Sequence, residues 1–295
     1  LGGQANVWTE MIRSKERLEF MILPRLSALA ERVWTNKDLY ESYRQRLISH
    51  YRIWDKKDLR YRMPDLSGFA DEQVLVDGKS VLTVHNPLPG TRVHYTADGS
   101  TPTASSPVLQ QTLTLTDTGR IRFSTISDAG AKSELYGVRI KNGQWTKSID
   151  VTNMNKRSGL AVSFYNGVFA NTAKMAGEVI RKEIISNVYL SDTIKMPAFG
   201  AKIRGMIQVP QKGIYSFYFT CDDGGVLKVA DQVVIDNDGQ HAPVMKSGQI
   251  ALEAGYHPFH IDFIEAGGGF TLKLQYSVNG SPVKAVPDGW FYNEG

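Results

Sequence analysis

The feature that most constrains the fold of this 295-residue chain is a change in the spacing of its apolar residues near residue 63. Before that point, apolar residues recur every three or four positions, which is the period of an amphipathic helix. After it, short alternating runs separated by Gly, Pro and Asp turns replace the helical period. The chain is therefore predicted to be mainly β, with an α-helical N-terminal segment.

The N-terminal segment, residues 1–63, is predicted to hold two helices. Pro24 lies inside the first apolar run and should kink or break it. The second helix is expected to begin at Asp38 as its N-cap, with Glu41 completing a capping box. The two stripes comprise Leu18, Ile22, Leu26, Leu29 and Val33, then Leu39, Tyr43, Leu47, Ile48, Tyr51 and Trp54. Two helices cannot bury both stripes against each other, so a larger body is expected to pack on them.

The rest of the chain is predicted to form two β-sandwiches, over residues 64–141 and 142–295. The smaller one is expected to use strands at 74–76, 80–84, 92–96, 111–115 and 120–124. The larger one is expected to use strands at 201–209, 214–220, 226–229, 259–264 and 270–276. With the helical segment at 1–63, this gives three domains.

Composition excludes several classes of protein. A hydrophobic share of 42% excludes a disordered chain, and no run approaches the ~20 apolar residues of a membrane helix. One cysteine, Cys221, excludes a disulfide framework and is expected to be a small buried residue. Residues 1–63 hold 13 Lys and Arg against 8 Asp and Glu, a balance that nucleic-acid binding or a solvated helix face would explain. The interspersed signs favour the solvated face, so no nucleic-acid partner is expected.

Two runs at the start of the chain point to a known enzyme family. They are Gln-Ala-Asn-Val-Trp-Thr-Glu at residues 4–10 and Pro-Arg-Leu-Ser-Ala-Leu-Ala-Glu at 24–31. Together they resemble the last barrel strand and following helix of family 20 glycoside hydrolases, the β-N-acetylhexosaminidases. The resemblance implies a remnant of a (β/α)8 barrel, with the upstream barrel as its packing partner. The chain also opens without Met or a signal peptide, so we expect a piece of a longer protein.

Trp8 and Glu10 are the candidate substrate-binding residues. Alternation in a strand places them on the same side, and at the mouth of a barrel they would face the substrate together. An indole offers a flat apolar face to a sugar ring, and a carboxylate accepts hydrogen bonds from hydroxyls. The resemblance implies that Trp8 walls the pocket for a terminal N-acetyl sugar and that Glu10 binds its outer hydroxyls. The alternative is a core tryptophan beside a salt-bridged glutamate.

The catalytic residues of that family are expected outside this chain. The resemblance implies an Asp-Glu pair in which the Glu is the general acid and the Asp orients the attacking substrate acetamide. The sequence has one Asp-Glu pair, Asp71-Glu72, in the wrong context, and we interpret it as a solvated turn. The parent would be an exo-acting β-N-acetylhexosaminidase that needs no cofactor, in the periplasm, on the outer surface or outside the cell. The fragment alone is predicted to be inactive.

A second motif is Tyr-Thr-Ala-Asp-Gly-Ser-Thr-Pro-Thr at residues 95–103. It predicts a tight turn that Asp98 caps, in which Gly99 adopts positive φ and Pro102 ends the turn. The run resembles a signature of the immunoglobulin-like or fibronectin-like domain that follows the barrel in many chitobiases. The resemblance implies a spacer, with sugar binding as the alternative.

A third set of motifs lies in the larger predicted sandwich. The runs at 213–225, 234–237 and 248–257 resemble the protective-antigen-type domain of glycosidases, adhesins and toxins. Some relatives bind Ca²⁺ through an adjacent Asp pair and then coordinate sugar hydroxyls, so Asp222 and Asp223 are the candidate calcium ligands. The alternative is a turn whose carboxylates accept local backbone N–H groups. A carbohydrate-binding or structural accessory module without a catalytic role is the alternative function for the chain.

Overall fold

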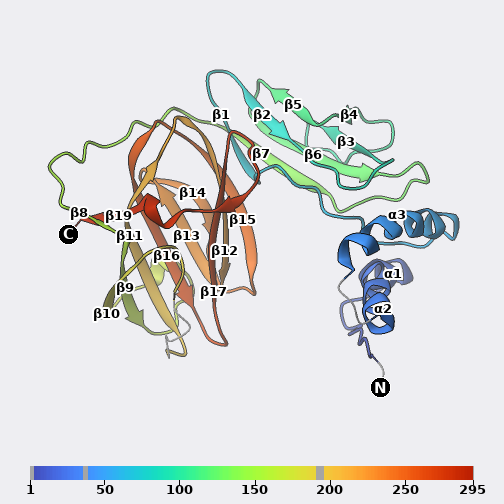
Figure 1. Ribbon diagram of the computed structural model, residues 1–295, viewed down its shortest axis with the longest axis horizontal. Helices are drawn as coiled ribbons and strands as arrows, with labels where there is room; N and C mark the ends of the chain where they lie inside the picture. The colour runs from blue at the N-terminus through green and yellow to red at the C-terminus, as the bar shows by residue number, and fades with distance from the viewer. Residues whose placement is uncertain (1–2, 36–38, 191–195, 295) are drawn as a thin grey trace. The chain divides into compact units, whose positions relative to one another are not determined.

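The computed structural model describes residues 3–35, 39–190 and 196–294 (Figure 1). It is mainly β with α-helices confined to the N-terminal segment, so this part of the predicted fold class is confirmed. The barrel remnant stays a prediction. Contacts divide the chain into two compact units. Unit 1 comprises Leu1–Ser67, Val84–Leu113 and Arg120–Gly137, and unit 2 comprises Gly68–Thr83, Thr114–Gly119 and Val138–Gly295. The three domains predicted from the sequence have other bounds and stay a prediction.

Three helices form the N-terminal part of unit 1: α1 (Lys15–Ile22), α2 (Arg25–Thr35) and α3 (Tyr40–Lys56). The Ser14 hydroxyl caps α1 by accepting the Arg17 N–H at 3.1 Å. The break between α1 and α2 falls at Pro24, as predicted, because proline cannot donate a helical hydrogen bond. Asp38, the predicted N-cap of α3, lies outside the described residues. None of these helices is long and apolar enough to cross a membrane.

The strands of unit 1 are β3 (Arg92–Thr96), β4 (Val108–Leu109) and nearly all of β6 (Gly119–Ile126). β3 pairs antiparallel with both β4 and β6. The predicted turn at 98–100 is confirmed, since the Asp98 carboxylate accepts the Ser100 N–H at 2.9 Å and Gly99 has φ +77°. A core cluster in this unit joins α3 to loop residues, and its members are Leu47, Tyr51, Trp54, Tyr61, Met63, Leu88 and Ala131.

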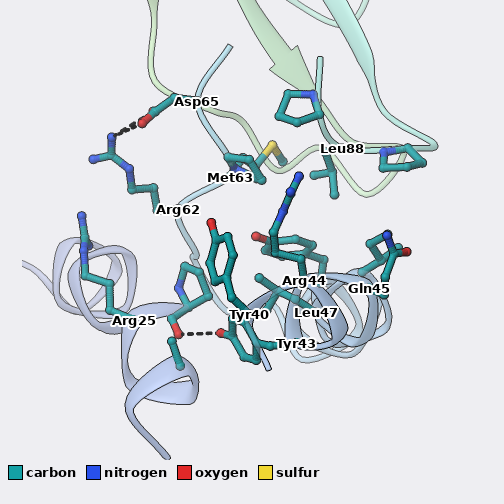
Figure 2. Close-up of a pocket in the computed structure, with 17 residues that line it drawn as sticks. Arg25, Tyr40, Tyr43, Arg44, Gln45, Leu47, Arg62, Met63, Asp65 and Leu88 are labelled. Atoms are coloured by element: carbon teal, nitrogen blue, oxygen red, sulfur yellow. Dashed lines mark hydrogen bonds and ion pairs between the residues drawn. The ribbon is translucent and has the colours of Figure 1, made fainter. Parts of the chain in front are cut away.

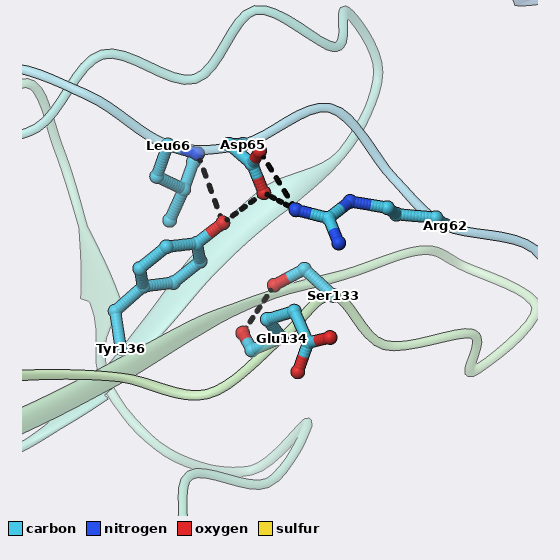
Figure 3. Close-up of polar contacts among 6 residues, drawn as sticks. All are labelled: Arg62, Asp65, Leu66, Ser133, Glu134 and Tyr136. Atoms are coloured by element: carbon cyan, nitrogen blue, oxygen red, sulfur yellow. Dashed lines mark hydrogen bonds and ion pairs between the residues drawn. The ribbon is translucent and has the colours of Figure 1, made fainter. Parts of the chain in front are cut away.

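A polar network fixes the segment that follows α3 within unit 1 (Figure 3). The Tyr136 hydroxyl donates to Asp65 at 2.9 Å and accepts the Leu66 N–H at 3.2 Å. Arg62 donates to both carboxylate oxygens of Asp65, each at 2.9 Å. Burial raises the pKa of Tyr136 to about 12, so its hydroxyl remains protonated and donates at neutral pH.

Unit 2 contains the remaining strands, and β5 (Thr112–Leu115) is divided between the units. Its first strands and 3₁₀ turn are β1 (Glu72–Leu75), β2 (Ser80–Thr83), most of β7 (Tyr136–Asn142), β8 (Lys156–Ser158), β9 (Leu160–Asn166), η1 (Thr172–Lys174) and β10 (Val179–Ile185). The central ones are β11 (Phe199–Val209), β12 (Gly213–Asp222), β13 (Gly224–Val229), β14 (Gln232–Asn237) and β15 (Val244–Leu252). The last are β16 (Gly255–Glu265), β17 (Thr271–Val278), β18 (Lys284–Ala285), η2 (Asp288–Trp290) and β19 (Phe291–Glu294).

Two sheets of unit 2 enclose one core. One sheet runs β10-β9-β11-β16-β13-β14, and within unit 2 the other runs β18-β17-β12-β15-β1-β7. Alternate side chains from both sheets fill the core, including Phe217 on β12, Leu227 on β13 and Phe263 on β16, all fully buried. This is the alternation that a two-sheet sandwich requires. All five strands predicted for the larger sandwich are confirmed.

Strand β1 is an interior strand of unit 2. It pairs parallel with β15 on one side and with β7 on the other. The Asp71 carboxylate accepts the N–H and hydroxyl of Ser247, each at 2.8 Å, and the Gln249 side chain accepts the Val74 N–H at 3.2 Å. Residues near 70 are therefore bonded to a strand about 175 positions later in the chain.

Candidate functional site

The segment that carries Trp8 and Glu10 lies at the surface of unit 1. Its described part, residues 3–13, forms no strand, so the predicted alternation of these two side chains is not tested. Trp8 is 77% exposed and Glu10 is also exposed. A strand needs neighbouring strands to satisfy its backbone groups, and this segment has no paired strand beside it. Neither residue is part of a closed site in the described structure.

Helix α2 presents an apolar face to solvent. Among its described residues none is buried, although its apolar residues follow the helical period closely. Leu26, Leu29 and Val33 are 36–48% exposed, and Trp34 is 88% exposed. Exposed apolar groups in one contiguous patch are typical of a surface that another body covers. The predicted need for a larger packing body therefore persists in the structure.

A cavity of about 400 Å³ lies between α2, α3 and two proline-containing loops of unit 1 (Figure 2). Its lining includes the side chains of Leu47, Met63 and Leu88, with the arginines Arg25 and Arg44 also present. Within the lining, the Tyr43 hydroxyl donates to the Pro24 carbonyl at 3.2 Å. The carboxylate in the lining is that of Asp65, which Arg62 and Tyr136 already engage. The cavity thus lacks the pair of free carboxyl groups that glycoside hydrolysis uses.

The Asp71-Glu72 pair is structural. Asp71 binds Ser247, and Glu72 forms ion pairs with Lys141 at 2.7 Å and Arg139 at 3.7 Å. Our interpretation of a solvated turn is wrong for Glu72, which opens strand β1. The pairing of β1 with β7 explains this environment. Arg139 and Lys141 lie two residues apart on β7, so both cations are on the face of the sheet that Glu72 shares. Both carboxylates are thus engaged in contacts that hold β1 in its sheet.

The predicted calcium ligands lie at one end of the unit 2 sandwich, where β12 ends. Asp222 and Asp223 are both partly exposed, and the peptide bond between them is cis. The Asp223 carboxylate accepts the Ala266 N–H at 2.6 Å. Burial, reinforced by the nearby Asp223 charge, raises the pKa of Asp222, while His241 opposes the shift. The two carboxylates are therefore close enough to repel each other.

Glu265 is the third acidic residue at this end, and sequence reasoning missed it. It is 2% exposed, and one carboxylate oxygen accepts the Gly267 N–H at 2.8 Å while the other has no hydrogen-bond partner. Burial raises its pKa, with Asp223 and Asp222 contributing further. The available signal was its position: Phe259, Ile261 and Phe263 alternate on the buried face of β16, and Glu265 follows two residues later.

A groove of about 680 Å³ lies beside this acidic residue. Its lining consists of Val168, Met196, Pro197, Ala198 and residues 265–270. Three consecutive glycines at 267–269 all have positive φ, so their backbone rather than side chains forms one wall. Glu265, the glycine backbone and Phe270 thus give this groove one acidic, one polar and one aromatic element.

No group of three or more His, Cys, Asp or Glu side chains is placed to hold a metal in the part of the chain that the structure describes. Asp222 and Asp223 would therefore need backbone or ligand oxygens to complete a calcium site. The prediction that Cys221 is a small buried residue is confirmed, since it is fully buried and Asn237 donates to its sulfur at 3.2 Å. Burial raises the pKa of the Cys221 thiol to about 12, which leaves it unreactive.

Three family models match successive segments of the chain. Residues 1–37 match the glycosyl hydrolase family 20 catalytic domain, and residues 75–137 match the chitobiase/beta-hexosaminidase C-terminal domain. Residues 156–289 match the PA14 domain, the protective-antigen type. All three resemblances expected from the sequence motifs are confirmed.

Two curated relatives are similar to this chain. A beta-hexosaminidase of Porphyromonas gingivalis is 25% identical over 298 aligned residues, which cover 94% of this chain and 37% of the relative. A beta-N-acetylhexosaminidase of Cellulomonas fimi is 36% identical over 64 residues, 21% of this chain and 13% of the relative. The chain is thus related to hexosaminidases, and it spans little more than a third of the length of the first relative.

Solved structures similar to this chain include two PA14 domains. One is the PA14 domain of the antifreeze protein MpAFP, with a TM-score of 0.42, 16% identity and coverage of 50% of this chain and 96% of that chain. The other is the PA14 sugar-binding domain of an RTX adhesin, with a TM-score of 0.41, 19% identity and coverage of 47% and 99%.

Proposed function

We propose that this chain is the C-terminal part of an exo-acting β-N-acetylhexosaminidase. The enzyme would remove terminal N-acetylhexosamine from glycans by substrate-assisted catalysis, with the catalytic Asp-Glu pair outside this chain. The observation that carries the proposal is the alignment to a beta-hexosaminidase over 94% of this chain but 37% of that relative. One continuous match across both units argues that they accompany the same catalytic domain.

The exposed surface of unit 1 supports this proposal. Trp8 and the α2 face formed by Leu26, Leu29 and Val33 are apolar and uncovered. Burial of apolar area stabilises a protein by roughly 25 cal/mol per Å², so a stripe of this kind favours a packing partner. We assign that partner to the upstream strands and helices of a family 20 barrel. Pairing with a neighbouring barrel strand would also satisfy the backbone of residues 3–13.

In that assembled barrel, Trp8 and Glu10 would form part of the sugar pocket. Trp8 would lie against the apolar face of the terminal N-acetyl sugar, and Glu10 would accept hydrogen bonds from its outer hydroxyls. Hydrogen bonds to a charged group contribute roughly 1.5–3 kcal/mol each. Neither residue transfers a proton in this proposal, since both act by positioning the substrate.

The proposal is tested in the protein that also contains the catalytic barrel, with a chromogenic N-acetyl-β-glucosaminide as substrate. Glu10→Gln should lower kcat/KM by roughly tenfold to a hundredfold, and Trp8→Ala should impair it further. The effect of Glu10→Gln should shrink for a substrate that lacks the hydroxyl it binds. The matched control is Glu178→Gln, at an exposed position of unit 2, which should leave kcat/KM unchanged.

The 295-residue chain by itself should show no turnover of the same substrate. Turnover that survives further purification, or a Glu10→Gln enzyme with near-normal kcat/KM, would contradict the assigned roles. In the second case Glu10 would be a structural residue, as the alternative interpretation has it.

The second candidate function is a carbohydrate-binding or structural accessory module. The groove beside Glu265 favours binding, because it combines Phe270 with backbone polar groups and an acidic side chain. Asp222 and Asp223 stay the candidate calcium ligands in this function. Titration of the 295-residue chain with N-acetylglucosamine oligomers distinguishes a binding module, which gives saturable binding, from a structural one, which gives none.

A further inference from the structure

Strand β10 is an uncovered edge of the unit 2 sandwich. Among the described residues it is the terminal strand of its sheet and pairs with β9 alone. Most of its residues are exposed, and Ile180 and Ile184 are 52% and 58% exposed. Natural edge strands are normally short, covered or rich in charges, because a free edge pairs readily with another strand. β10 spans seven residues and carries two exposed isoleucines beside three charged residues and a bulge, so another strand can pair with it only if that strand matches its charges.

The two faces of β10 differ in chemistry. Arg181 and Glu183 lie opposite Phe164 and Val162 of β9, whose side chains point into the core, so both belong to the inner face at the sheet edge. They form an ion pair with each other. Lys182 and Ile184 alternate with them and belong to the outer face. A bulge between Val179 and Arg181 makes Ile180 the extra residue on this strand.

The sequence of β10, Val-Ile-Arg-Lys-Glu-Ile-Ile, is complementary to itself when reversed. An antiparallel copy centred on Lys182 places Arg181 opposite Glu183 of the second copy, and the same contact occurs twice. Ile184 then faces the bulged end of the second copy, where Ile180 is the extra residue and lies outside the regular ladder. Opposite charges paired across strands stabilise a sheet.

We propose that β10 is a self-association site, at which two copies of this chain pair their β10 strands antiparallel about Lys182. The two sheets would join into one continuous sheet across a two-fold axis, which is the symmetry expected of an interface that uses the same patch twice. The ion pairs within each strand become a four-charge cluster shared by both copies. The two Lys182 side chains meet at the axis, and their repulsion keeps the association reversible.

Cysteine cross-linking tests the register directly. The native Cys221 is fully buried, so an added surface cysteine is the reactive thiol. Directly opposed residues of an antiparallel pair have Cα atoms about 4.5–5.5 Å apart, within the range that a disulfide spans. Lys182→Cys should therefore form a disulfide-linked dimer on mild oxidation. Ile184→Cys should cross-link at least about tenfold more slowly, because four residue steps, about 13 Å, separate it from its own copy.

The matched control is Lys147→Cys, an exposed position in a loop of unit 2. Faster cross-linking of Lys182→Cys than of both other variants supports the proposal. A Lys182→Cys rate equal to that of Lys147→Cys overturns self-pairing. An Ile184→Cys rate equal to that of Lys182→Cys overturns the register and with it the proposed site.

Charge reversal tests the same contact without a cross-link. Arg181→Glu brings like charges together twice and should weaken dimerisation by about tenfold or more in sedimentation velocity runs over a concentration series. Adding Glu183→Arg restores opposite charges and should recover the dimer. Self-association through the α2 face would not respond to either change, so an unchanged dimer fraction in Arg181→Glu overturns the proposal. Circular dichroism checks that each variant keeps its fold.

Discussion

Helix α2 and strand β16 both carry a strongly patterned apolar face, yet only β16 buries it. The described residues of α2 include none that is buried, whereas Phe259, Ile261 and Phe263 of β16 are fully buried. The difference lies in their partners: β16 pairs on both sides and faces a second sheet, while α2 has a mainly exposed apolar face. A periodic pattern of apolar residues thus predicts a helix or a strand. Packing stabilises that helix or strand only where the chain itself supplies the surface that covers its apolar face.

The largest expected effect sharpens this comparison with one substitution made in both regions. Leu227→Ala in the sandwich core should lower the free energy of unfolding by about 2–5 kcal/mol, because it removes fully buried methyl groups and leaves a cavity. Leu26→Ala on α2, where the leucine is 45% exposed, should change it by about 0.5 kcal/mol or less. Urea unfolding followed by circular dichroism measures both.

Equal losses in the two variants would break the comparison, since they would mean that α2 is packed in this chain after all. The Leu26 result should change in the protein that contains the barrel. There the same substitution should become costly, because the proposed partner would cover this face.

A smaller effect is expected at the acidic end of the sandwich. Burial raises the folded-state pKa of Glu265 above its ordinary value of 4.5. A raised carboxyl pKa contributes stability that is present below the ordinary value and lost as pH rises through the folded-state value. Glu265→Gln does not titrate, so its stability relative to the wild type should increase as the pH rises above the ordinary carboxyl value of 4.5.

The control for this measurement is Glu178→Gln, an exposed position that should leave the pH dependence unchanged. Thermal unfolding at a series of pH values gives the difference directly. A difference that stays flat, or falls as pH rises, would show that Glu265 is not held in a site that disfavours its charge.

The smallest expected effect is that of calcium, for which we predict no shift in the melting temperature. A bound ion stabilises the folded state by mass action. Asp223 already accepts the Ala266 N–H, and neither Glu265 nor any other acidic residue is placed to complete a metal site with this pair in the described residues. The melting temperature should be the same with excess calcium and with a chelator. A calcium-dependent rise that Asp223→Asn abolishes would overturn this prediction and favour the accessory binding function.

The sequence predicted the strands well, whereas the candidate site residues stay predictions. Alternation located β11 and β16, and Pro24 located the helix break, because both signals are local. The role of Asp71 could not be read locally, since its partner Ser247 lies 176 residues away. The burial of Glu265 could not be predicted for a related reason. Its carboxylate is buried by the conformation of the loop that follows it, and composition does not report that conformation. The geometry of Trp8 and Glu10 depends on strands that pair beside them, and no such strand occurs among the residues that the structure describes.

The placement of β1 inside the sheet of unit 2 determines which gene segment encodes a complete sandwich domain. A gene segment that begins at residue 142 includes the whole PA14 match at 156–289, but it omits β1 and most of β7. The protein it encodes would expose the edge of β15 and uncover Ala251, which packs with Val74 and Val76. The boundary of the matched PA14 segment therefore does not coincide with the boundary of the folded sandwich. A transferable cassette would have to carry the strand at 72–75 together with the sandwich, so these segments are expected to move between genes as one piece.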